Sequence, residues 1–577
     1  MIMAEDNKMI KGSHILMRAL KEVGVQVIWG YPGGQIMPVY DALYDYQDTF
    51  RHILVRHEQG AIHAAQGYAR VSGKTGVVLV TSGPGATNVM TGIADAMIDS
   101  TPVVVISGQV GNNMLGTDAF QEADVIGLST PVTKWCYQIR RPQDIAPAVA
   151  KAFYIASSGR PGPVLLDITR DAQVGLAEYH FDICTSIRSY RPCPPMPEKD
   201  VRTAAEMIAR ADRPLLIYGQ GITLSGAEDA LKAFLDKTGI PATSTLLGLS
   251  ALPSNYKHFI GMAGMHGNIA PNVMTQKCDL LIAIGMRFDD RVTCKMSEYA
   301  KQARKIHIDI DEAEIGKNIR VDLGVHGDAK AVLERLTELV PSSDYTEWEM
   351  VATKCHEAEV KEVIDPEIHP TEGPVTMGEV INTVADVVKD SAIVITDVGQ
   401  NQMLGARYSR FNHKRSLITS GGLGTMGFGL PAAIGAKVAS PDRQVCLFVG
   451  DGGLQMTIQE LGTIMQEGTG VKIVVLNNNW LGNVRQWQQL FWKSRYSFTR
   501  LMNPDFKAIT EAYGIKYLRV SDREHLVEAV QQMIDEPGPC LLEACVLEEG
   551  MVFPMIAPGK SVEDIMVTKD KLFVYGE

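Results

Sequence analysis

Two short segments in the last third of the chain hold residue types that bind a divalent cation. Phe448-Val-Gly-Asp-Gly-Gly453 places an acid after an apolar run, and Val471–Asn479 ends a second apolar run in asparagines. Parallel strands joined by one crossover helix present their carboxyl ends side by side. Asp451 and Asn478 can therefore reach one cation. Magnesium takes octahedral oxygen ligands and keeps diphosphate oxygens among them, so a carboxylate and an amide oxygen suffice from the protein.

The same pattern has a plainer interpretation, namely a tight strand-to-helix turn and an unrelated asparagine run. Together, at this spacing, the two segments resemble the signature of thiamine-diphosphate enzymes, in which Gly452 and Gly453 let the backbone approach the phosphates. A competing motif, Gly422-Leu-Gly-Thr-Met-Gly427, fits the GxGxxG loop of dinucleotide-binding folds. That fold needs an acid at the end of the second strand, whereas Asp442 precedes the strand expected at Gln444–Val449. A nicotinamide site is therefore not expected.

Glu58 is the second candidate for chemistry. It lies in Arg56-His-Glu-Gln-Gly-Ala61, at the carboxyl end of a strand expected at Ile53–Val55 and just before a helix expected from Gly60. Thiamine activation needs a nearly dry carboxylate that shares a proton with N1′ of the aminopyrimidine ring. The spacing by itself fits better an ordinary acid at a helix start, which the helix dipole stabilises.

A family resemblance covers nearly the whole chain, from about Gly12 to Met566. The segment around Glu58, together with Thr81–Asn88 and Gly116–Asp124, is similar to the catalytic large subunit of acetohydroxyacid synthase, also called acetolactate synthase. The likeness continues through Ser157–Pro163, Gly264–Gly267, Ile284–Thr293, Ser420–Gly427, Val484–Trp487 and Phe553–Met555. It implies an α/β fold of three doubly wound parallel-sheet domains.

The resemblance implies roles for the residues named so far. Glu58 is the N1′ partner, and Asp451, Asn478 and the backbone carbonyl of Trp480 bind magnesium. Met426 holds the cofactor bent, although core packing also explains an apolar residue there. Gln121 is expected near the reacting atoms. The remaining thiamine-diphosphate contacts are expected at Tyr31, Gly33, Gly34, Pro84, Asn88, Val398, Gly399, Gln400, Gly424, Gly450, Gly452 and Gly453.

The middle of the chain matches the flavin-binding positions of that family. Arginines such as Arg160 and Arg287 can meet a diphosphate, and acids that follow strands can meet ribose hydroxyls. Each such residue alone is more typical of a solvated surface. The resemblance implies bound FAD without net redox chemistry, with contacts from Arg160, Gly219, Gly221, Thr245, Leu246, Met265, His266, Gly285, Met286, Arg287, Asp289, Arg291, Val292, Asp309, Ile310 and Asp328.

The implied activity is decarboxylation of pyruvate and transfer of the hydroxyethyl unit to pyruvate or 2-oxobutyrate. The products, 2-acetolactate and 2-aceto-2-hydroxybutyrate, lead to valine, leucine and isoleucine. The alternative is a pyruvate oxidase or 2-oxo acid decarboxylase of the same superfamily; decarboxylases usually carry adjacent histidines, and the sequence has none. Trp487 is expected to wall the acceptor's alkyl end, with core packing as the alternative, and Arg291 to meet its carboxylate. Asn401 replaces the usual His and Asn483 the usual Met or Leu, which leaves acceptor preference open.

The elements that must position these residues are short apolar strands alternating with helical stretches, a pattern typical of parallel α/β domains. The proline-rich segment Tyr190–Pro197 interrupts that pattern and indicates a linker. We expect a pyrimidine-binding domain at 1–188, a linker at 189–198, an FAD domain at 199–340, a second linker with some helix at 341–374, and a diphosphate- and magnesium-binding domain at 375–577. Strands are expected at Val25–Trp29, Ile53–Val55, Gly76–Thr81, Pro102–Gln109, Pro163–Asp167, Pro214–Tyr218, Leu280–Ile284, Lys305–Asp309, Ala392–Thr396, Ser416–Thr419, Gln444–Val449, Lys472–Asn477 and Pro539–Ala544.

Composition narrows the class of protein. A chain of 577 residues is too long for one core, and a net charge of −12 argues against a nucleic-acid partner. No apolar stretch reaches the roughly 18 residues of a membrane span, and Met1–Gly12 lacks the apolar core of a secretory signal. The nine cysteines form no CxxC pair, so buried, reduced thiols and a cytoplasmic location are expected. The resemblance implies a homodimer or homotetramer, with each site built between two subunits, and a separate small regulatory subunit.

Overall fold

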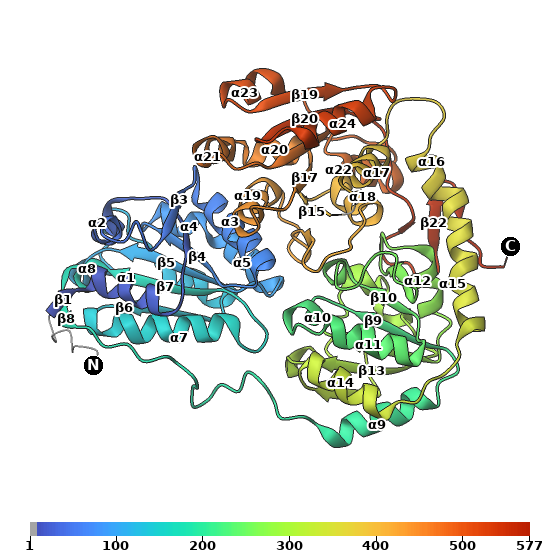
Figure 1. Cartoon of the computed structure of the whole chain (residues 1–577), viewed down its shortest axis with the longest axis horizontal. Coiled ribbons are helices and arrows are strands. Elements are labelled where there is room, and N and C mark those ends of the chain that lie inside the picture. Colours follow the sequence, from blue (N-terminus) through green and yellow to red (C-terminus); the bar gives the residue numbers. More distant parts are fainter. Residues whose placement is uncertain (1–8, 390, 577) are drawn as a thin grey trace.

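The computed structural model describes residues 9–389 and 391–576. Three six-stranded sheets, each wholly parallel, form three α/β domains, which confirms the predicted fold class (Figure 1). The central strands of each sheet are buried along their whole length because helices cover both faces. The carboxyl ends of these strands, and the loops that follow them, carry the candidate site residues.

The first domain has the strand order β3-β2-β4-β5-β7-β6. Its strands are β2 (Val27–Gly30), β3 (Arg51–Leu54), β4 (Gly76–Val80), β5 (Val103–Gln109), β6 (Trp135–Ile139) and β7 (Val164–Thr169). Its helices are α1 (Gly12–Glu22), α2 (Met37–Tyr44), α3 (Glu58–Ser72), α4 (Pro84–Asn88), α5 (Met90–Ile98), α6 (Val125–Ser129), α7 (Ile145–Ser157) and α8 (Arg170–Val174). The sequence prediction missed β6, an edge strand whose side chains are mostly half-buried and so lack a clear apolar pattern.

The third domain has the order β16-β15-β17-β18-β20-β19. Its strands are β15 (Ile393–Thr396), β16 (Leu417–Ile418), β17 (Val445–Gly450), β18 (Lys472–Asn477), β19 (Lys516–Val520) and β20 (Cys540–Cys545). Its helices are α17 (Met377–Val388), α18 (Gln400–Tyr408), α19 (Gly429–Ala439), α20 (Asp451–Met456), α21 (Leu461–Glu467), α22 (Gly482–Phe491), α23 (Phe506–Ala512) and α24 (Leu526–Asp535). Counted within each domain, the first and third sheets share the order 2-1-3-4-6-5, so the two domains duplicate one topology.

The central domain has a different order, β11-β10-β9-β12-β13-β14. Its strands are β9 (Pro214–Tyr218), β10 (Ala242–Ser244), β11 (Phe259–Met262), β12 (Leu280–Ile284), β13 (Arg304–Asp309) and β14 (Leu323–His326). Its helices are α9 (Glu198–Ala209), α10 (Gly221–Leu224), α11 (Glu228–Thr238), α12 (Ile269–Thr275), α13 (Asp290–Thr293) and α14 (Ala329–Leu339). Counted within the domain the order is 3-2-1-4-5-6, which is that of dinucleotide-binding domains.

The first and third domains pack closely through α3 and α19. A Cβ added to Gly67 would lie 2.1 Å from the carbonyl oxygen of Ala432, and one added to Gly435 would lie 1.9 Å from that of Ala64. Glycine at these two positions therefore lets the helix backbones touch. The apolar side chains of both domains form one continuous buried cluster across this contact.

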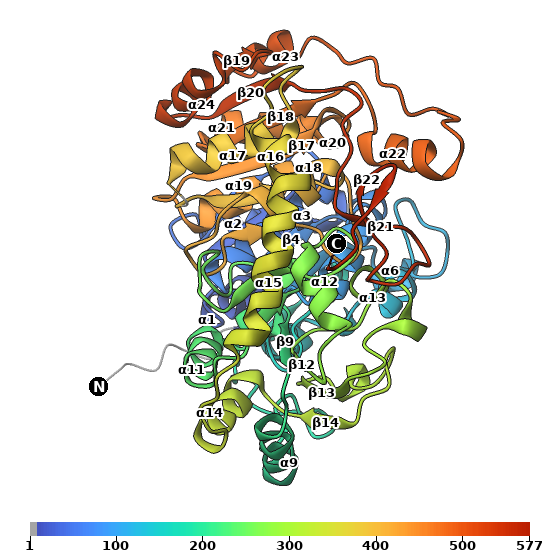
Figure 2. The same cartoon turned by 90° about the vertical axis from the view of Figure 1, so that its right-hand side faces the viewer.

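The segment expected as a second linker is mainly helical. Helix α15 (Thr346–Glu359) continues through a π-helical stretch, Val360–Ile364, into α16 (Asp365–Ile368). Trp348 Nε1 donates to the carbonyl of Pro214 at 2.9 Å, which holds α15 against the central domain. Helix α15 lies along the right-hand edge of the molecule in Figure 1, and in Figure 2 it runs upright across the face toward the viewer, between the third domain at the top and the central domain below. The carboxyl-terminal tail adds a small antiparallel sheet of β21 (Met555–Ile556), β22 (Ile565–Thr568) and β23 (Lys571–Leu572).

The nine cysteines all lie in the described residues, and none of them is paired there. Four are buried, but Cys193 is exposed and the others are half-buried, so the expectation of uniformly buried thiols was wrong. Cys193 belongs to the proline-rich connection, which has no core to enter. In the described part of the chain, no helix combines the length and the apolar character that a membrane crossing requires.

Candidate active site

In the first domain, three predicted residues gather around the start of α4. Glu58 is the first residue of α3, and its Oε2 accepts a hydrogen bond from Nδ2 of Asn88 at 3.0 Å. A Cβ added to Gly85 would lie 3.4 Å from Glu58 Oε1, so α4 packs directly against this carboxylate. Gln121 lies on the other side, with its backbone 2.9 Å from the position of a Cβ on Gly83.

The other predicted residues of this domain lie where the strand order reverses, between β2 and β4. Tyr31, Gly33 and Gly34 follow β2, and Pro84 begins α4 shortly after β4. A Cβ on Gly33 would lie 2.6 Å from the side chain of Thr81, so the two loops touch. Open α/β sheets bind ligands at this kind of crevice. The structure therefore brings these predicted residues together in one crevice.

Glu58 does not lie in a nearly dry site within this chain. Its side chain is half-buried, although α4 packs against its carboxylate. Its charge is nevertheless felt by Tyr40, whose pKa is raised by burial and by the neighbouring Glu58. The expectation of a shielded carboxylate is thus not met by the single chain.

In the third domain, Asp451 and Asn478 come to the same edge of the sheet, as the spacing predicted. Strands β17 and β18 pair in parallel with Gly450 opposite Leu476, so the residues after them are neighbours. Asp451 Oδ1 is buried and has no hydrogen-bond partner among the described residues. Burial raises the pKa of Asp451 to about 6. A buried carboxylate oxygen without a partner fits a site that a cation completes.

The amide of Asn478 is held on both sides. Its Oδ1 accepts from the backbone N–H of Trp480 at 3.1 Å, and its Nδ2 donates to Gln400 Oε1 at 3.4 Å. Gln400 begins α18, directly after Val398 and Gly399 at the end of β15. The predicted residues that follow β15 and β17 therefore meet at the point where the strand order reverses, as they do in the first domain.

Asn401, where the sequence departs from the family pattern, lies in this same crevice. Its side chain is buried, and its Nδ2 donates to the carbonyl of Phe448 at 3.1 Å. Its Oδ1 lies 3.2 Å from a Cβ added to Gly399 and 3.7 Å from one added to Gly450. Asn401 thus packs against both the loop after β15 and the end of β17.

Met426 belongs to the loop that precedes α19. Its Cε lies 3.9 Å from the position of a Cβ on Gly452, so it rests over the start of α20, next to Asp451. A Cβ on Gly453 would lie 2.6 Å from Asp397 Oδ1, which leaves room only for glycine there. The structure thus brings together all the predicted residues of the third domain.

The two parts of the predicted site are not bonded to each other within the described residues. No hydrogen bond there links Glu58 with Asp451, Asn478 or Met426. The turn before Glu58 is instead tied to the third domain elsewhere, since the backbone N–H of Arg56 donates to Glu460 Oε1 at 3.1 Å.

A cavity of about 630 Å³ lies between the three domains. It opens at the carboxyl ends of β9 and β12, where a Cβ on Gly221 would lie 2.5 Å from Cα of Gly285. Gly219, another predicted flavin contact, does not line the cavity but packs against Gly285, which does. All the other predicted flavin contacts line the cavity: Arg160, Gly221, Thr245, Leu246, Met265, His266, Gly285, Met286, Arg287, Asp289, Arg291, Val292, Asp309, Ile310 and Asp328.

The charged and titratable groups of this cavity differ in their ion pairs and in their pKa values. Arg160 forms ion pairs with Asp311 at 3.2 Å and with Glu314 at 2.8 Å, so it joins the first domain to the central domain. Burial raises the pKa of Asp309 to about 6. Burial lowers the pKa of His266 to about 3, with a smaller contribution from nearby arginines, so this imidazole is neutral near pH 7.

Helix α22 of the third domain forms another wall of the cavity. Asn483 and Trp487, one turn apart, both line it, together with Val398 and Gly424. Asn483 Oδ1 and Trp487 Nε1 are buried and have no hydrogen-bond partners among the described residues. The ring of Trp487 packs edge-on against Phe491, with ring centroids 5.6 Å apart. Trp487 therefore lines a cavity and is not simply part of the core.

Comparison with known proteins gives a consistent result along the chain. Residues 10–128 match the thiamine pyrophosphate enzyme N-terminal TPP binding domain, 201–336 its central domain, and 397–544 its C-terminal TPP binding domain. The "acetolactate synthase large subunit" of Lactococcus lactis subsp. lactis (strain IL1403) is 43% identical over 561 residues, 97% of this chain and 96% of that protein. The "acetolactate synthase isozyme 2 large subunit" of Escherichia coli (strain K12) is 43% identical over 558 residues, 96% of this chain and 99% of that protein. The chain belongs to the acetolactate synthase large-subunit family.

The family assignment agrees with the topology. The two TPP binding domains are those that share one strand order, and the central domain has the order of dinucleotide-binding domains. Thiamine diphosphate is therefore the cofactor for which these domains are built, and the resemblance found in the sequence is confirmed.

Sequence reasoning missed Asn503, which lies on the connection between α22 and α23. Its Nδ2 donates to Asp451 Oδ2 at 2.6 Å and lies within 3.1 Å of the side-chain oxygens of Asn477 and Asn479. Its Oδ1 accepts from Gln455 at 2.9 Å. A lone asparagine 52 residues beyond Asp451 carries no sequence signal that would have identified it.

Proposed function

We propose that the chain is the catalytic subunit of an acetolactate synthase, which decarboxylates pyruvate and joins the hydroxyethyl unit to a second 2-oxo acid. The family membership supports this activity, and so do the two TPP binding domains. The observation that carries the proposal is the buried, unpartnered Oδ1 of Asp451 next to Asn478, at the crevice of the third domain. The site is built to receive a cation together with a diphosphate.

Magnesium would be held by Asp451 Oδ1, by the amide oxygen of Asn478 and by the backbone carbonyl of Trp480. Asn503 occupies the other oxygen of Asp451, so Oδ1 is the one left for the metal. Gly452 and Gly453 start α20, where free backbone N–H groups favour phosphate oxygens. The protein thus supplies few direct charges and leaves the remaining ligands to the diphosphate and water.

When bound, thiamine diphosphate supplies the nucleophilic carbon and stabilises the electron pair that decarboxylation releases. Glu58 would share a proton with N1′ of the aminopyrimidine ring, and its hydrogen bond from Asn88 orients the carboxylate for that task. Met426 would support the cofactor from the side of α20. Trp487 and Asn483 would bound the acceptor, with Arg291 meeting its carboxylate at the mouth of the cavity.

A second copy of the chain is needed to complete this site. No hydrogen bond joins Glu58 to Asp451 among the described residues, and large exposed apolar side chains stand next to residues of both parts of the site. Phe120 next to Gln121 is 84% exposed, and Met502 next to Asn503 is 97% exposed. Exposed apolar groups at the edges of both half-sites support a homodimer in which the first domain of one subunit covers the third domain of the other.

The dimer proposal has a direct test by complementation. A Glu58→Gln chain and an Asp451→Ala chain should each be nearly inactive alone. After they are mixed by reversible dissociation, half of the dimers are hybrids with one intact site of two, so about a quarter of wild-type activity should return. If no activity returns although mass spectrometry shows that hybrid dimers have formed, each site must lie within one chain.

FAD is the ligand that fits the central cavity best. The strand order, the close approach of Gly221 and Gly285, and the presence of Arg287 and Asp309 all support a dinucleotide at this crevice. Arg160 is expected to contribute less than the sequence suggested, because two carboxylates already bind it. Denaturation of the purified protein should release FAD, and the supernatant spectrum and chromatography identify it.

One assay separates the proposed activity from its alternatives. The protein is incubated with pyruvate, magnesium and thiamine diphosphate, with and without oxygen, and acetolactate, acetaldehyde and peroxide are quantified in parallel. Acetolactate as the main product, formed equally without oxygen, is the expected result. Acetaldehyde as the main product would indicate a decarboxylase, and peroxide in step with oxygen uptake would indicate an oxidase.

Regulation by a separate small subunit is proposed from the family, since the relatives are themselves named large subunits. Specific activity and inhibition by valine should both rise when the small subunit of a close relative is added. Full activity and full valine inhibition of this chain alone would count against a separate regulatory subunit.

A further inference from the structure

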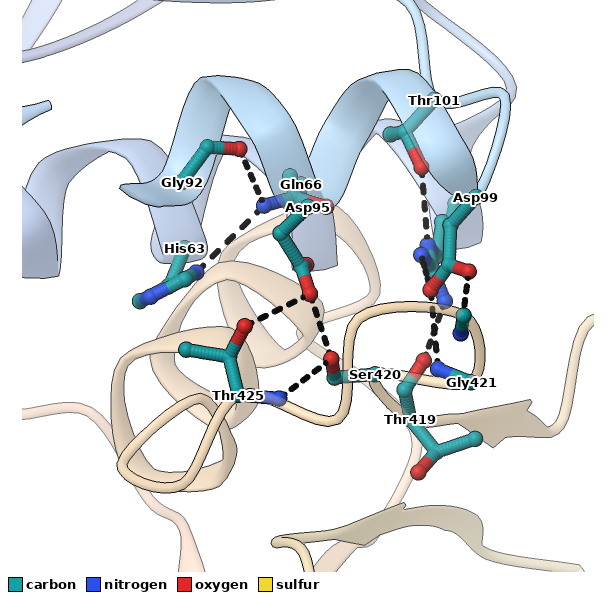
Figure 3. A network of polar contacts seen from close by, with 12 residues as sticks. His63, Gln66, Gly92, Asp95, Asp99, Thr101, Thr419, Ser420, Gly421 and Thr425 are labelled. Atoms are coloured by element: carbon teal, nitrogen blue, oxygen red, sulfur yellow. Dashed lines mark hydrogen bonds and ion pairs between the residues drawn. The ribbon is translucent and has the colours of Figure 1, made fainter. Parts of the chain in front are cut away.

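Two acids, one in α5 and one directly after it, reach from the first domain to a loop of the third domain. Asp95 lies in α5 and Asp99 is the residue that caps its carboxyl end, and they are 0% and 1% exposed. Figure 3 shows both carboxylates pointing from the helix to the loop that contains Thr419, Ser420, Gly421 and Thr425. None of these four loop residues is near the acids in sequence, so only the fold brings them together.

Asp95 holds the loop through a single oxygen. Its Oδ1 accepts from the hydroxyl of Ser420 and from the hydroxyl of Thr425, the latter at 2.9 Å. The hydroxyl oxygen of Ser420 in turn accepts from the backbone N–H of Thr425 at 2.9 Å. Asp95 Oδ2 is buried and has no partner among the described residues. One acceptor oxygen therefore closes the loop from Ser420 to Thr425.

Asp99 holds the loop through both oxygens. Its Oδ1 accepts from the backbone N–H of Gly422 at 2.7 Å, and its Oδ2 accepts from that of Gly421 at 2.9 Å. Oδ2 also accepts from Arg70 Nη2 at 2.7 Å, and Arg70 Nη1 donates to the carbonyl of Thr419 at 2.5 Å. A Cβ on Gly422 would lie 2.8 Å from Asp99 Oδ1, so the contact requires glycine.

This loop borders both predicted cofactor sites. Ser420, Gly421, Gly422 and Gly424 line the central cavity, and Met426 rests over the start of α20. Gly424 and Gly427 have φ of +71° and +86°, in the region where glycine imposes little conformational preference. A loop with this composition does not hold its own shape, so its conformation depends on what anchors it.

We propose that Asp95 and Asp99 are positioning residues that set the loop 420–427 for thiamine diphosphate. Asp95 acts as a one-oxygen acceptor, whereas Asp99 acts as a two-oxygen acceptor paired with Arg70. The inference rests on the proposed role of Gly424 and Met426 in binding that cofactor. Neither acid touches the reacting atoms, so both act through the loop.

The two roles predict opposite responses to the same conservative change. An asparagine at position 95 keeps an oxygen for both hydroxyls, and its amide nitrogen takes the place of Oδ2, which bonds nothing among the described residues, so every hydrogen bond from Asp95 to the loop is kept. An asparagine at position 99 must point an N–H₂ group either at Gly422 N–H or at Gly421 N–H and Arg70, where only acceptors fit. Asparagine should therefore be tolerated at 95 and not at 99.

The experiment compares Asp95→Asn, Asp95→Leu and Asp99→Asn with wild type and with Asp41→Asn, which changes an exposed acid of α2 in the same domain. The dissociation constant for thiamine diphosphate with magnesium is measured by calorimetry, and kcat and KM for pyruvate are measured at saturating cofactor. Asp95→Asn and Asp41→Asn should stay within about 2-fold of wild type. Asp95→Leu and Asp99→Asn should weaken cofactor binding by about 10-fold or more, since each leaves buried donors unpaired.

Thr425→Val serves where a substitution at 95 or 99 prevents folding, because it removes one donor to Asp95 at nearly constant volume; about 3-fold weaker cofactor binding is expected. A merely structural role would lower thermal stability without the contrast between asparagine at 95 and at 99. Equal cofactor affinity in all folded variants overturns the inference, and so does an Asp95→Asn defect as large as that of Asp95→Leu. Failure of wild type to bind thiamine diphosphate would instead refute the proposed function.

Discussion

Replacing Glu58 by glutamine isolates the proposed proton-sharing step. Glu58 Oε2 accepts from Asn88 Nδ2 at 3.0 Å, and the amide oxygen of a glutamine can take over that bond. The other oxygen faces α4 at Gly85, where an amide nitrogen of the same size fits. The substitution therefore changes at most about 1 kcal/mol of hydrogen bonding, and the free energy of unfolding should hardly move.

The catalytic effect should be much larger, because an amide cannot share the N1′ proton. General acid–base groups contribute on the order of 10²–10⁴-fold to turnover, which corresponds to about 3–5 kcal/mol of activation free energy. Affinity for thiamine diphosphate should stay within about 3-fold of wild type, since Asp451 and Asn478 at the diphosphate end are unchanged.

The assay is the rate of acetolactate formation at saturating pyruvate, magnesium and thiamine diphosphate, with cofactor affinity from calorimetry and stability from thermal unfolding. Glu22→Gln, at an exposed position of the same domain, is the matched control and should behave as wild type. Turnover of Glu58→Gln within about 3-fold of wild type would refute the assignment of Glu58 to N1′. Loss of cofactor binding in parallel with turnover would contradict the structural part of the reasoning.

Three further predictions concern other parts of the chain. Asp451→Ala should weaken thiamine-diphosphate binding by about 100-fold or more in calorimetry, since it removes the carboxylate proposed to bind magnesium; unchanged affinity would mean that the metal lies elsewhere. Wild type should prefer 2-oxobutyrate over pyruvate as acceptor by about 10-fold or more, and Trp487→Leu should bring the two close to parity in a competition assay; equal selectivity in both proteins would remove Trp487 from the acceptor pocket. Burial raises the pKa of Glu367 from 4.5 to about 7, so its contribution to stability is lost as pH rises through that range. Glu367→Gln, which keeps the acceptor for Gly378 N–H, should therefore raise Tm more at about pH 8 than at about pH 5, and an equal shift at both pH values would contradict the assigned cause.

Local sequence patterns were enough to locate the candidate metal-binding residues of the third domain. An apolar run followed by Gly-Asp-Gly, and another followed by Asn-Asn, specify two buried parallel strands and the side chains at their ends, so the neighbourhood of Asp451 and Asn478 was predictable. The pattern also placed Glu58 between a strand and a helix, at the start of α3, but only the family resemblance singled it out. Two of the missed strands, β6 and β14, are half-buried edges in which the apolar pattern is weak. The missed β10 is buried and internal, but it is only three residues long and includes Thr243 and Ser244.

Only the tertiary structure decided how these elements combine. The shared strand order of the first and third domains has no repeat in the sequence, because a topology constrains which strands pair and leaves most residue types free. The pairing of Arg160 with two acids depends on a domain contact that spacing cannot show.

The same limit applies to the residues that support the site. Asn503 reaches Asp451, and Asp95 and Asp99 reach the loop before Met426, across large separations in sequence. A hydrogen bond between distant residues depends on the path of the whole chain, whereas a motif reports only on its own neighbourhood. The sequence therefore predicted which groups are candidates for the chemistry, and the packing of the domains determined which residues hold those candidates in place.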